Sequence, residues 1–205
     1  MMHAMEFMVR KVKLVALISV MLAGCQKDEV IPAPTPAPVP APAVRYTDLG
    51  NTPIVNMYGR SIDIDGDATK DFYFQALPVG DPVLGRVRLQ FYAYSKIHSS
   101  LLNDAVDQSP MLDQSALITA TFPGYTWYEI SAVVVAEEIT PDNAAPYWEG
   151  TFKNASHKYL PVRIQRNGQY YFGWIEITMD KENRKLILHR AGISTEAGKE
   201  IKAGS

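Results

Sequence analysis

Alternating apolar and polar positions predict strands along much of the chain. Arg86–Ile97 alternates cleanly, which is typical of a strand with one buried face, and its apolar side chains share one side: Val87, Leu89, Phe91, Ala93 and Ile97. Tyr128–Ile139 is more continuously apolar and predicts a more deeply buried strand. Asp71–Leu77 predicts another strand earlier in the chain.

A hairpin is predicted in the last third of the chain. Val162–Gln165 and Tyr170–Met179 read as strands, and Asn167-Gly168 lies between them. This dipeptide supplies the positive φ values that a type I′ turn requires. Leu186–Ala191 predicts one further strand after a polar turn.

Several short strands with turn signals between them predict an all-β fold. We expect residues 45–205 to form a single antiparallel β-sandwich of the jelly-roll-like kind, which is long enough to enclose a sizeable core. Leu101–Leu117 lacks the β alternation, so we expect an irregular or short helical insert there.

Residues 1–24 have the form of a secretory signal peptide. Met1–Lys13 carries three basic residues and precedes the short apolar segment Leu14–Gly24. As a helix this apolar segment would be roughly 16 Å long, too short for a hydrocarbon core of about 30 Å. Leu22-Ala23-Gly24-Cys25 resembles the bacterial lipobox, and Cys25 is the only cysteine of the chain. The pattern therefore predicts lipidation of Cys25; the alternative is an ordinary signal peptide with an incidental cysteine.

Residues 25–44 are expected to form a lipidated N-terminus and a stalk. Gln26-Lys27-Asp28-Glu29 resembles the export signal of bacterial surface lipoproteins, which favours an outer-membrane anchor on the cell surface over an inward-facing one. Proline occupies every second position of 32–42, so the stalk is expected to be extended. At about 3.1 Å per residue, the 14 residues Ile31–Val44 would reach roughly 40 Å. A proline-recognition ligand is the alternative reading of this segment.

Composition limits the partners of the chain. Its 205 residues include 20 basic and 22 acidic ones, a formal net charge of −2. There is no basic excess to neutralise phosphates, so we expect no nucleic-acid partner. A single cysteine excludes a disulfide framework and a cysteine-rich metal site.

The segment 63–71 is the clearest candidate for chemistry. Aspartates stand at loop positions 1, 3, 5 and 9, and so many carboxylates in one tight loop repel each other unless a cation joins them. Ca²⁺ takes six to eight oxygens in flexible geometry, so a structural Ca²⁺ is the expected cofactor. The expected ligands are side-chain oxygens and one carbonyl, from Asp63, Asp65, Asp67, Thr69 and Asp71.

Two departures from the EF-hand pattern predict weak binding. Position 12 is Phe74 in place of a bidentate glutamate, and position 6 is Ala68 in place of glycine. A left-handed backbone at Ala68 would cost roughly 1–2 kcal/mol. We expect a dissociation constant of about 10⁻⁴ to 10⁻³ M, as in extracellular modules. A solvated acidic turn without metal is the alternative.

Three short motifs together resemble a family of secreted or anchored bacterial β-proteins of unknown role. They are the acidic loop Asp63–Phe72, the segment Tyr171–Ile175 and the closing stretch Ala191–Gly204; Tyr159–Arg163 matches loosely. The resemblance covers most of 45–205. It implies an extracellular β-domain and implies no activity.

The residues offer little support for an enzyme. His98, His157 and His189 are far apart in the sequence, without the spacing of a zinc site, and His98-Ser99-Ser100 lacks the surroundings of a nucleophilic serine. Glycoside hydrolysis needs two carboxyl groups at a set separation, which the sequence does not reveal. The candidates are Glu129, Glu137, Glu138, Glu149 and Glu176.

Aromatic residues offer a possible binding surface. Tyr147 and Trp148 follow Pro146 in a turn-rich stretch and are the expected ligand-binding residues, since exposed aromatic rings bind sugars or proteins. Core packing is the alternative for these aromatics, for the cluster at 125–128 and, above all, for Trp174.

These observations lead to one functional expectation. The chain is predicted to be a surface-anchored lipoprotein, stabilised by calcium, that acts as a non-catalytic binding or structural module for a glycan or a surface protein. The rival hypotheses are an extracellular glycan-active enzyme and a subunit of a surface complex.

Overall fold

The structure, a computed structural model, describes residues 43–205, which all belong to one compact unit. The predicted signal peptide, the lipidation site Cys25 and the stalk as far as residue 42 lie outside the described residues. Within residues 43–205 no helix is long and apolar enough to cross a membrane.

The described residues form strands joined by turns and loops, all of the strand pairs being antiparallel. The strands are β1 (Val44–Ile54), β2 (Gly59–Ile62), β3 (Phe72–Asp81), β4 (Arg86–Ser95), β5 (Ser99–Asn103), β6 (Leu117–Ile118), β7 (Thr126–Glu129), β8 (Ala132–Pro141), β9 (Tyr147–Glu149), β10 (Lys158–Arg166), β11 (Gln169–Asp180), β12 (Lys185–Ser194) and β13 (Ile201–Lys202).

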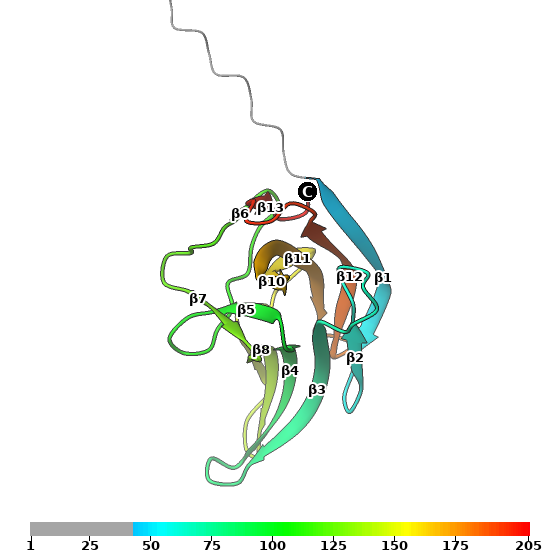
Figure 1. The fold of residues 1–205 in the computed structure, drawn as a ribbon. Coiled ribbons are helices and arrows are strands. Elements are labelled where there is room, and N and C mark those ends of the chain that lie inside the picture. The colour runs from blue at the N-terminus through cyan, green and yellow to red at the C-terminus, as the bar shows by residue number, and fades with distance from the viewer. Residues whose placement is uncertain (1–42) are drawn as a thin grey trace, which may run out of the picture. The chain divides into compact units, whose positions relative to one another are not determined.

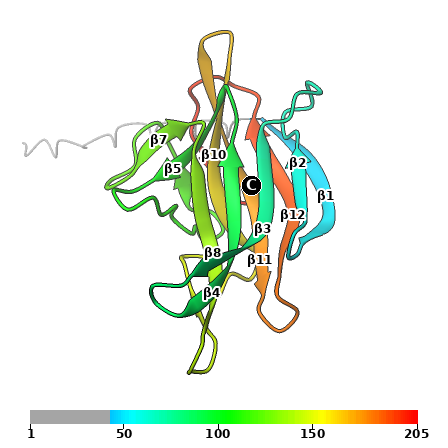
Figure 2. The same cartoon turned by 90° about the horizontal axis from the view of Figure 1, so that it is seen from below.

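Two main sheets face each other across an apolar core, as expected for an antiparallel β-sandwich. One has the strand order β1-β12-β11-β10-β5-β7 and the other β2-β3-β4-β8-β9. Figure 2 shows β3, β4 and β8 in front of β10, β11 and β12. Both sheets contribute fully buried side chains to the core, such as Phe74 and Phe91 from one and Ile175 and Leu188 from the other. The predicted fold class is therefore confirmed.

A second, smaller core lies on the other side of the six-stranded sheet. Alternate residues of β11 point to opposite faces, so Ile175 joins the main core while Phe172 and Trp174 face outward. The short ribbon of β6 and β13 covers them with Ile118 and Ile201. Figure 1 shows this ribbon beyond β10 and β11, away from β3, β4 and β8. Burial on both faces explains why β11 is apolar along most of its length.

The predicted hairpin is present, and the predicted insert is irregular only between its two ends. Asn167 and Gly168 have φ values of 51° and 75°, and they connect β10 to β11 with Arg166 paired to Gln169. The segment 101–117 contains no helix: it begins inside β5, continues as a loop, and is tied at Leu112 to Tyr159 by two backbone hydrogen bonds of 3.0 Å.

Two local predictions are wrong. Tyr128–Ile139 is not one strand, because Ile130 has φ 53° and the chain passes there from β7 in one sheet to β8 in the other. Val87 and Ile97 are exposed, whereas Leu89, Phe91 and Ala93 are buried. Val87 lies near the exposed end of the β3–β4 hairpin, and Ile97 follows the end of β4 in a turn.

Candidate functional site

The acidic loop joins β2 to β3 and brings three carboxylates together. Asp71 N donates to Ile62 O at 2.9 Å and so closes the loop at its base. Asp63, Asp65 and Asp71 each offer one oxygen, and these oxygens all lie within 4.8 Å of one another. Asp65 is 2% exposed and Asp71 5% exposed, so two of the three carboxylates are almost removed from water.

Backbone N–H groups hold these carboxylates in place. The Asp63 carboxylate accepts hydrogen bonds from Gly66 N at 2.6 Å and Ala68 N at 2.9 Å, and Asp71 Oδ2 accepts one from Ile64 N at 2.8 Å. Ala68 does adopt a left-handed backbone, with φ 72°. The local strain at an alanine in this conformation, about 1–2 kcal/mol, is therefore part of the loop.

The loop is electrostatically unfavourable as it stands. Burial raises the pKa of the Asp71 carboxyl to about 7, even though the hydrogen bond from Ile64 N opposes the rise. Burial also raises the pKa of Asp65. Within the described part of the chain Asp65 Oδ2 is buried without a hydrogen-bond partner. Arg166 brings an opposite charge to this carboxylate, with its Nε 3.6 Å from Asp65 Oδ2.

The other two predicted ligands lie in the same loop, and the Asp67 carboxylate is not part of this group. Asp67 and Thr69 are exposed, and Asp67 Oδ1 accepts a hydrogen bond from Thr69 N at 2.7 Å. Asp63, Asp65 and Asp71 therefore make up the carboxylate cluster. Their hard oxygen atoms suit a divalent cation such as Ca²⁺, while the Arg166 guanidinium supplies part of the same neutralisation.

The predicted aromatic pair on β9 is divided between the two faces of its sheet. The Trp148 ring stacks on Phe91 with centroids 6.0 Å apart, and Trp148 packs against the main core. Tyr147 points the other way and is 42% exposed. Tyr147 is thus the exposed member of the pair. Trp174, interpreted as a core residue, is fully buried.

The five candidate glutamates for glycoside hydrolysis are spread over both sheets. Glu137 and Glu149 are cross-strand neighbours, and Glu138 Oε2 pairs with Arg184 Nε at 2.6 Å. Glu129 lies on β7, where its Oε1 accepts from His98 N at 2.6 Å. Glu176, on β11, belongs to a polar cluster with two histidines.

This histidine cluster was missed by the sequence reasoning. The rings of His157 and His189 stack with centroids 4.4 Å apart, and His157 Nδ1 lies 2.6 Å from Glu176 Oε1. Arg190 Nε donates to Glu176 Oε2 at 2.6 Å. No spacing along the chain signals this group, and the one hint is the acidic Glu176 within an otherwise apolar strand.

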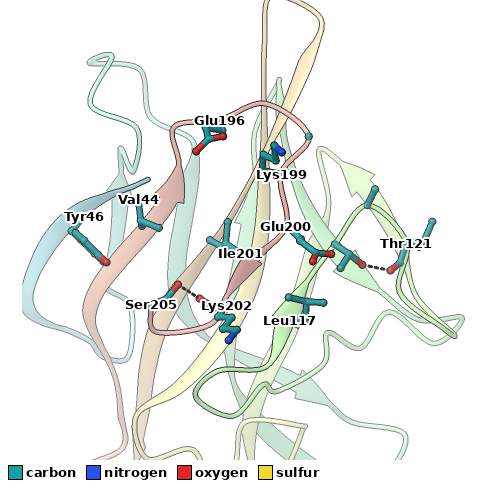
Figure 3. Close-up of a pocket in the computed structure, with 13 residues that line it drawn as sticks. Val44, Tyr46, Leu117, Thr121, Glu196, Lys199, Glu200, Ile201, Lys202 and Ser205 are labelled. Atoms are coloured by element: carbon teal, nitrogen blue, oxygen red, sulfur yellow. Dashed lines mark hydrogen bonds between the residues drawn. The ribbon is translucent and has the colours of Figure 1, made fainter. Parts of the chain in front are cut away.

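A cavity of about 800 Å³ lies beside the β6–β13 ribbon. Figure 3 shows that Val44 and Tyr46 of β1 line it on one side and that the C-terminal segment 196–205 and residues near 117–121 line it on the other. A smaller cavity of about 360 Å³ opens over the histidine cluster, and Tyr46 lines this cavity as well.

Comparison with known proteins assigns this chain to no family, so its class is described by its fold alone. No family model, no curated protein and no solved structure matches this chain. The fold and the two sites therefore define an antiparallel β-sandwich with an acidic loop at one sheet and a histidine-lined cavity on the other.

Proposed function

We propose that this chain is a cell-surface lipoprotein, anchored to the outer membrane through Cys25, whose β-sandwich is a non-catalytic binding or structural module that holds one Ca²⁺ in its acidic loop. The lipid anchor is supported by Leu22–Cys25 and by the position of the single cysteine. An extracellular location in turn supports calcium binding, because a site of weak affinity is occupied only where the free Ca²⁺ concentration is high.

The single observation that carries the calcium part is the convergence of Asp63, Asp65 and Asp71. Their oxygens lie within 4.8 Å of one another in a largely buried place, where each negative charge raises the cost of the others. A bound divalent cation would remove this repulsion and would give Asp65 Oδ2 a partner. Binding would then stabilise the fold by mass action.

Thermal unfolding of the full-length chain in detergent tests the metal. With Ca²⁺ at ten to a hundred times the dissociation constant, which is about 1 to 100 mM over the expected range, we expect a gain of about 1.4 to 2.7 kcal/mol over the protein in chelator. That corresponds to a melting temperature about 3 to 10 °C higher. Mg²⁺ should be less effective because it demands octahedral geometry and releases its water reluctantly.

Two variants separate the site from general ionic effects. Asp65→Asn should abolish the calcium-dependent shift, whereas Asp107→Asn, which changes an exposed aspartate of another loop, should leave it intact. Identical melting temperatures in Ca²⁺ and in chelator would rule out a calcium-stabilised loop.

Mass spectrometry of the mature chain tests the anchor. We expect the N-terminal residue to be Cys25 carrying acyl chains, and a Cys25→Ser variant to lose both the acyl mass and the membrane fraction. Digestion of the protein by protease added to intact cells would support surface display. An unmodified Cys25 thiol on a chain recovered from the cytosol would contradict the whole proposal.

A further inference from the structure

The cavity over the histidine cluster is built by two coinciding irregularities of the sheet. In β12, His189 and Arg190 together stand opposite the single residue Glu176 of β11, because the register passes from Ile175↔Ala191 to Ile177↔Leu188. Such a bulge turns two successive side chains toward one face. The neighbouring β1 also skips, from Asp48 paired with Arg190 to Thr52 paired with Leu188.

The side chains around Glu176 are locked by hydrogen bonds. Glu176 is 5% exposed, and its two oxygens are taken by His157 Nδ1 and Arg190 Nε, each at 2.6 Å. Burial raises the pKa of the Glu176 carboxyl, but the hydrogen bonds from Arg190 and His157 outweigh it and leave the pKa below its ordinary value. Glu176 is therefore an ionised anchor for its two partners.

The stacked histidine pair is held in one arrangement. His189 Nδ1 lies 2.6 Å from Asn51 Oδ1, and His189 Nε2 lies 2.8 Å from Thr178 Oγ1. A neutral His189 that donates from Nδ1 and accepts at Nε2 satisfies both contacts. Burial, followed by the nearby His157, lowers the pKa of His189, which favours this neutral form. His157 directs Nδ1 to Glu176, and its side chain is otherwise exposed. Its Nε2 can therefore form a hydrogen bond with a ligand.

The charges of the cavity select against an anion. Its lining carries Asp48 and Glu176 against Arg190, and Arg190 is already paired with Glu176. The remaining hydrogen-bonding groups of the lining are the exposed His157 ring, the Asp48 carboxylate, whose Oδ1 accepts from Gly50 N at 2.8 Å, and the Arg190 guanidinium, which lies 5.3 Å from the centre of the Trp174 ring. A phosphate or carboxylate would lose more to the acidic groups than it gains from one neutralised arginine.

Tyr46 adds an apolar wall and connects the two cavities. It is 57% exposed on β1, paired with Gly192, and its ring lies 6.3 Å from the Trp174 ring. The side chain lines both the 360 Å³ cavity and the larger one drawn in Figure 3. A flat aromatic face beside mixed donors and acceptors suits a sugar ring, with apolar C–H groups on one side and hydroxyls around its edge.

The geometry points to a binding site for a neutral oligosaccharide: one sugar unit in the cavity of Glu176, His157 and Arg190, packed on Tyr46, and the next units in the larger cavity beyond Tyr46. This inference rests on the binding-module part of the proposed function. It is independent of the calcium loop, which belongs to the other sheet, and of the lipid anchor.

Isothermal titration of the full-length chain with named sugar chains tests the site. The probes are cellohexaose, maltohexaose, xylohexaose and mannohexaose, with hexagalacturonate as the anionic comparison. We expect at least one neutral chain to bind, and Tyr46→Ala to weaken that binding by about tenfold or more through loss of the ring contact. His157→Ala should weaken it as well.

Tyr128→Ala is the matched control, since Tyr128 is a half-exposed tyrosine of β7 at the opposite edge of the same sheet. It should leave binding unchanged. Because Tyr46 is exposed, Tyr46→Ala should fold, which its melting curve would verify. Absence of binding by all four neutral chains, preference for hexagalacturonate, or binding that survives both Tyr46→Ala and His157→Ala would each overturn the inference.

Measuring sugar binding in the presence of chelator distinguishes failure of the sugar site from failure of the proposed calcium site. Sugar binding in chelator, together with a missing calcium shift, would uphold the sugar site and refute the metal. Hydrolysis of a bound chain that stops in Glu176→Gln would also uphold the sugar site, while refuting the non-catalytic part of the proposed function.

Discussion

Gly192 of β12 lies against the indole ring of Trp174, its cross-strand partner on β11. A Cβ atom added at Gly192 would lie 2.6 Å from Trp174 Cζ2 and 2.7 Å from Cε2, closer than real contacts allow. The glycine therefore makes room for the largest side chain of the second core.

Gly192→Ala should accordingly destabilise the protein by overpacking. We expect a loss of about 1–3 kcal/mol in the free energy of unfolding, measured by urea denaturation. Gly80→Ala is the control, because nothing lies within 4 Å of a Cβ added there. Equal midpoints for the two variants would show that the Trp174 ring moves aside at little cost.

Arg166→Gln should strengthen calcium binding. The Arg166 guanidinium lies 3.6 Å from Asp65 Oδ2 and repels a cation held by the same carboxylate. Removing this charge should raise calcium affinity several-fold in isothermal titration, while costing some stability through the lost contact with the Tyr171 ring at 4.0 Å. Arg60→Gln, at an exposed position, should change neither quantity. A weaker affinity in Arg166→Gln would mean that Arg166 supports the site.

His189 should make stability fall in mild acid. Burial, and then the neighbouring His157, place the pKa of His189 below 6.5 in the folded state, so the unfolded chain binds the proton more readily. The stability that follows is present above about pH 6.5 and is lost as the pH falls through the folded-state pKa. The lowered pKa of Glu176 affects stability only at lower pH, below the ordinary pKa of 4.5 for this carboxyl.

Urea midpoints of the wild type and of His189→Gln between neutral pH and about pH 5 isolate this contribution as the difference between the two proteins, because the raised pKa of Asp71, about 7, acts in the opposite direction in both. On acidification His189→Gln should lose less stability, or gain more, than the wild type, whereas His98→Gln, which changes a mostly exposed ring, should follow the wild type. An unchanged slope in His189→Gln would assign the acid sensitivity to other groups.

Trp148 and Tyr147 should respond differently to truncation. Trp148→Ala removes the ring stacked on Phe91 and should cost about 2–4 kcal/mol of unfolding free energy. Tyr147→Ala removes an exposed ring and should stay within about 0.5 kcal/mol. If instead Tyr147→Ala is the more damaging change, β9 contributes to the fold through its outer face.

Strands with one buried face were predictable from their patterns, as Leu89, Phe91 and Ala93 of β4 illustrate. The β10–β11 turn was equally predictable, because positive φ at Asn167 and Gly168 is a local requirement. β1 was not predicted: its edge position leaves only one neighbour, and the irregularity at 49–51 interrupts its alternation. The break at Ile130 was hidden because a β-branched residue with positive φ gives no turn signal.

The acidic loop could be predicted from the sequence, whereas the histidine cluster could not. Asp63, Asp65 and Asp71 are close in sequence, so one short loop is enough to gather them, and their spacing alone pointed to a cation. His157, Glu176 and His189 meet only because strand register and two bulges align them across three neighbouring segments. Residue order along the chain carries local alternation, turns and loops. Contacts between distant strands depend on how the whole sheet packs, and no short stretch of sequence specifies that packing.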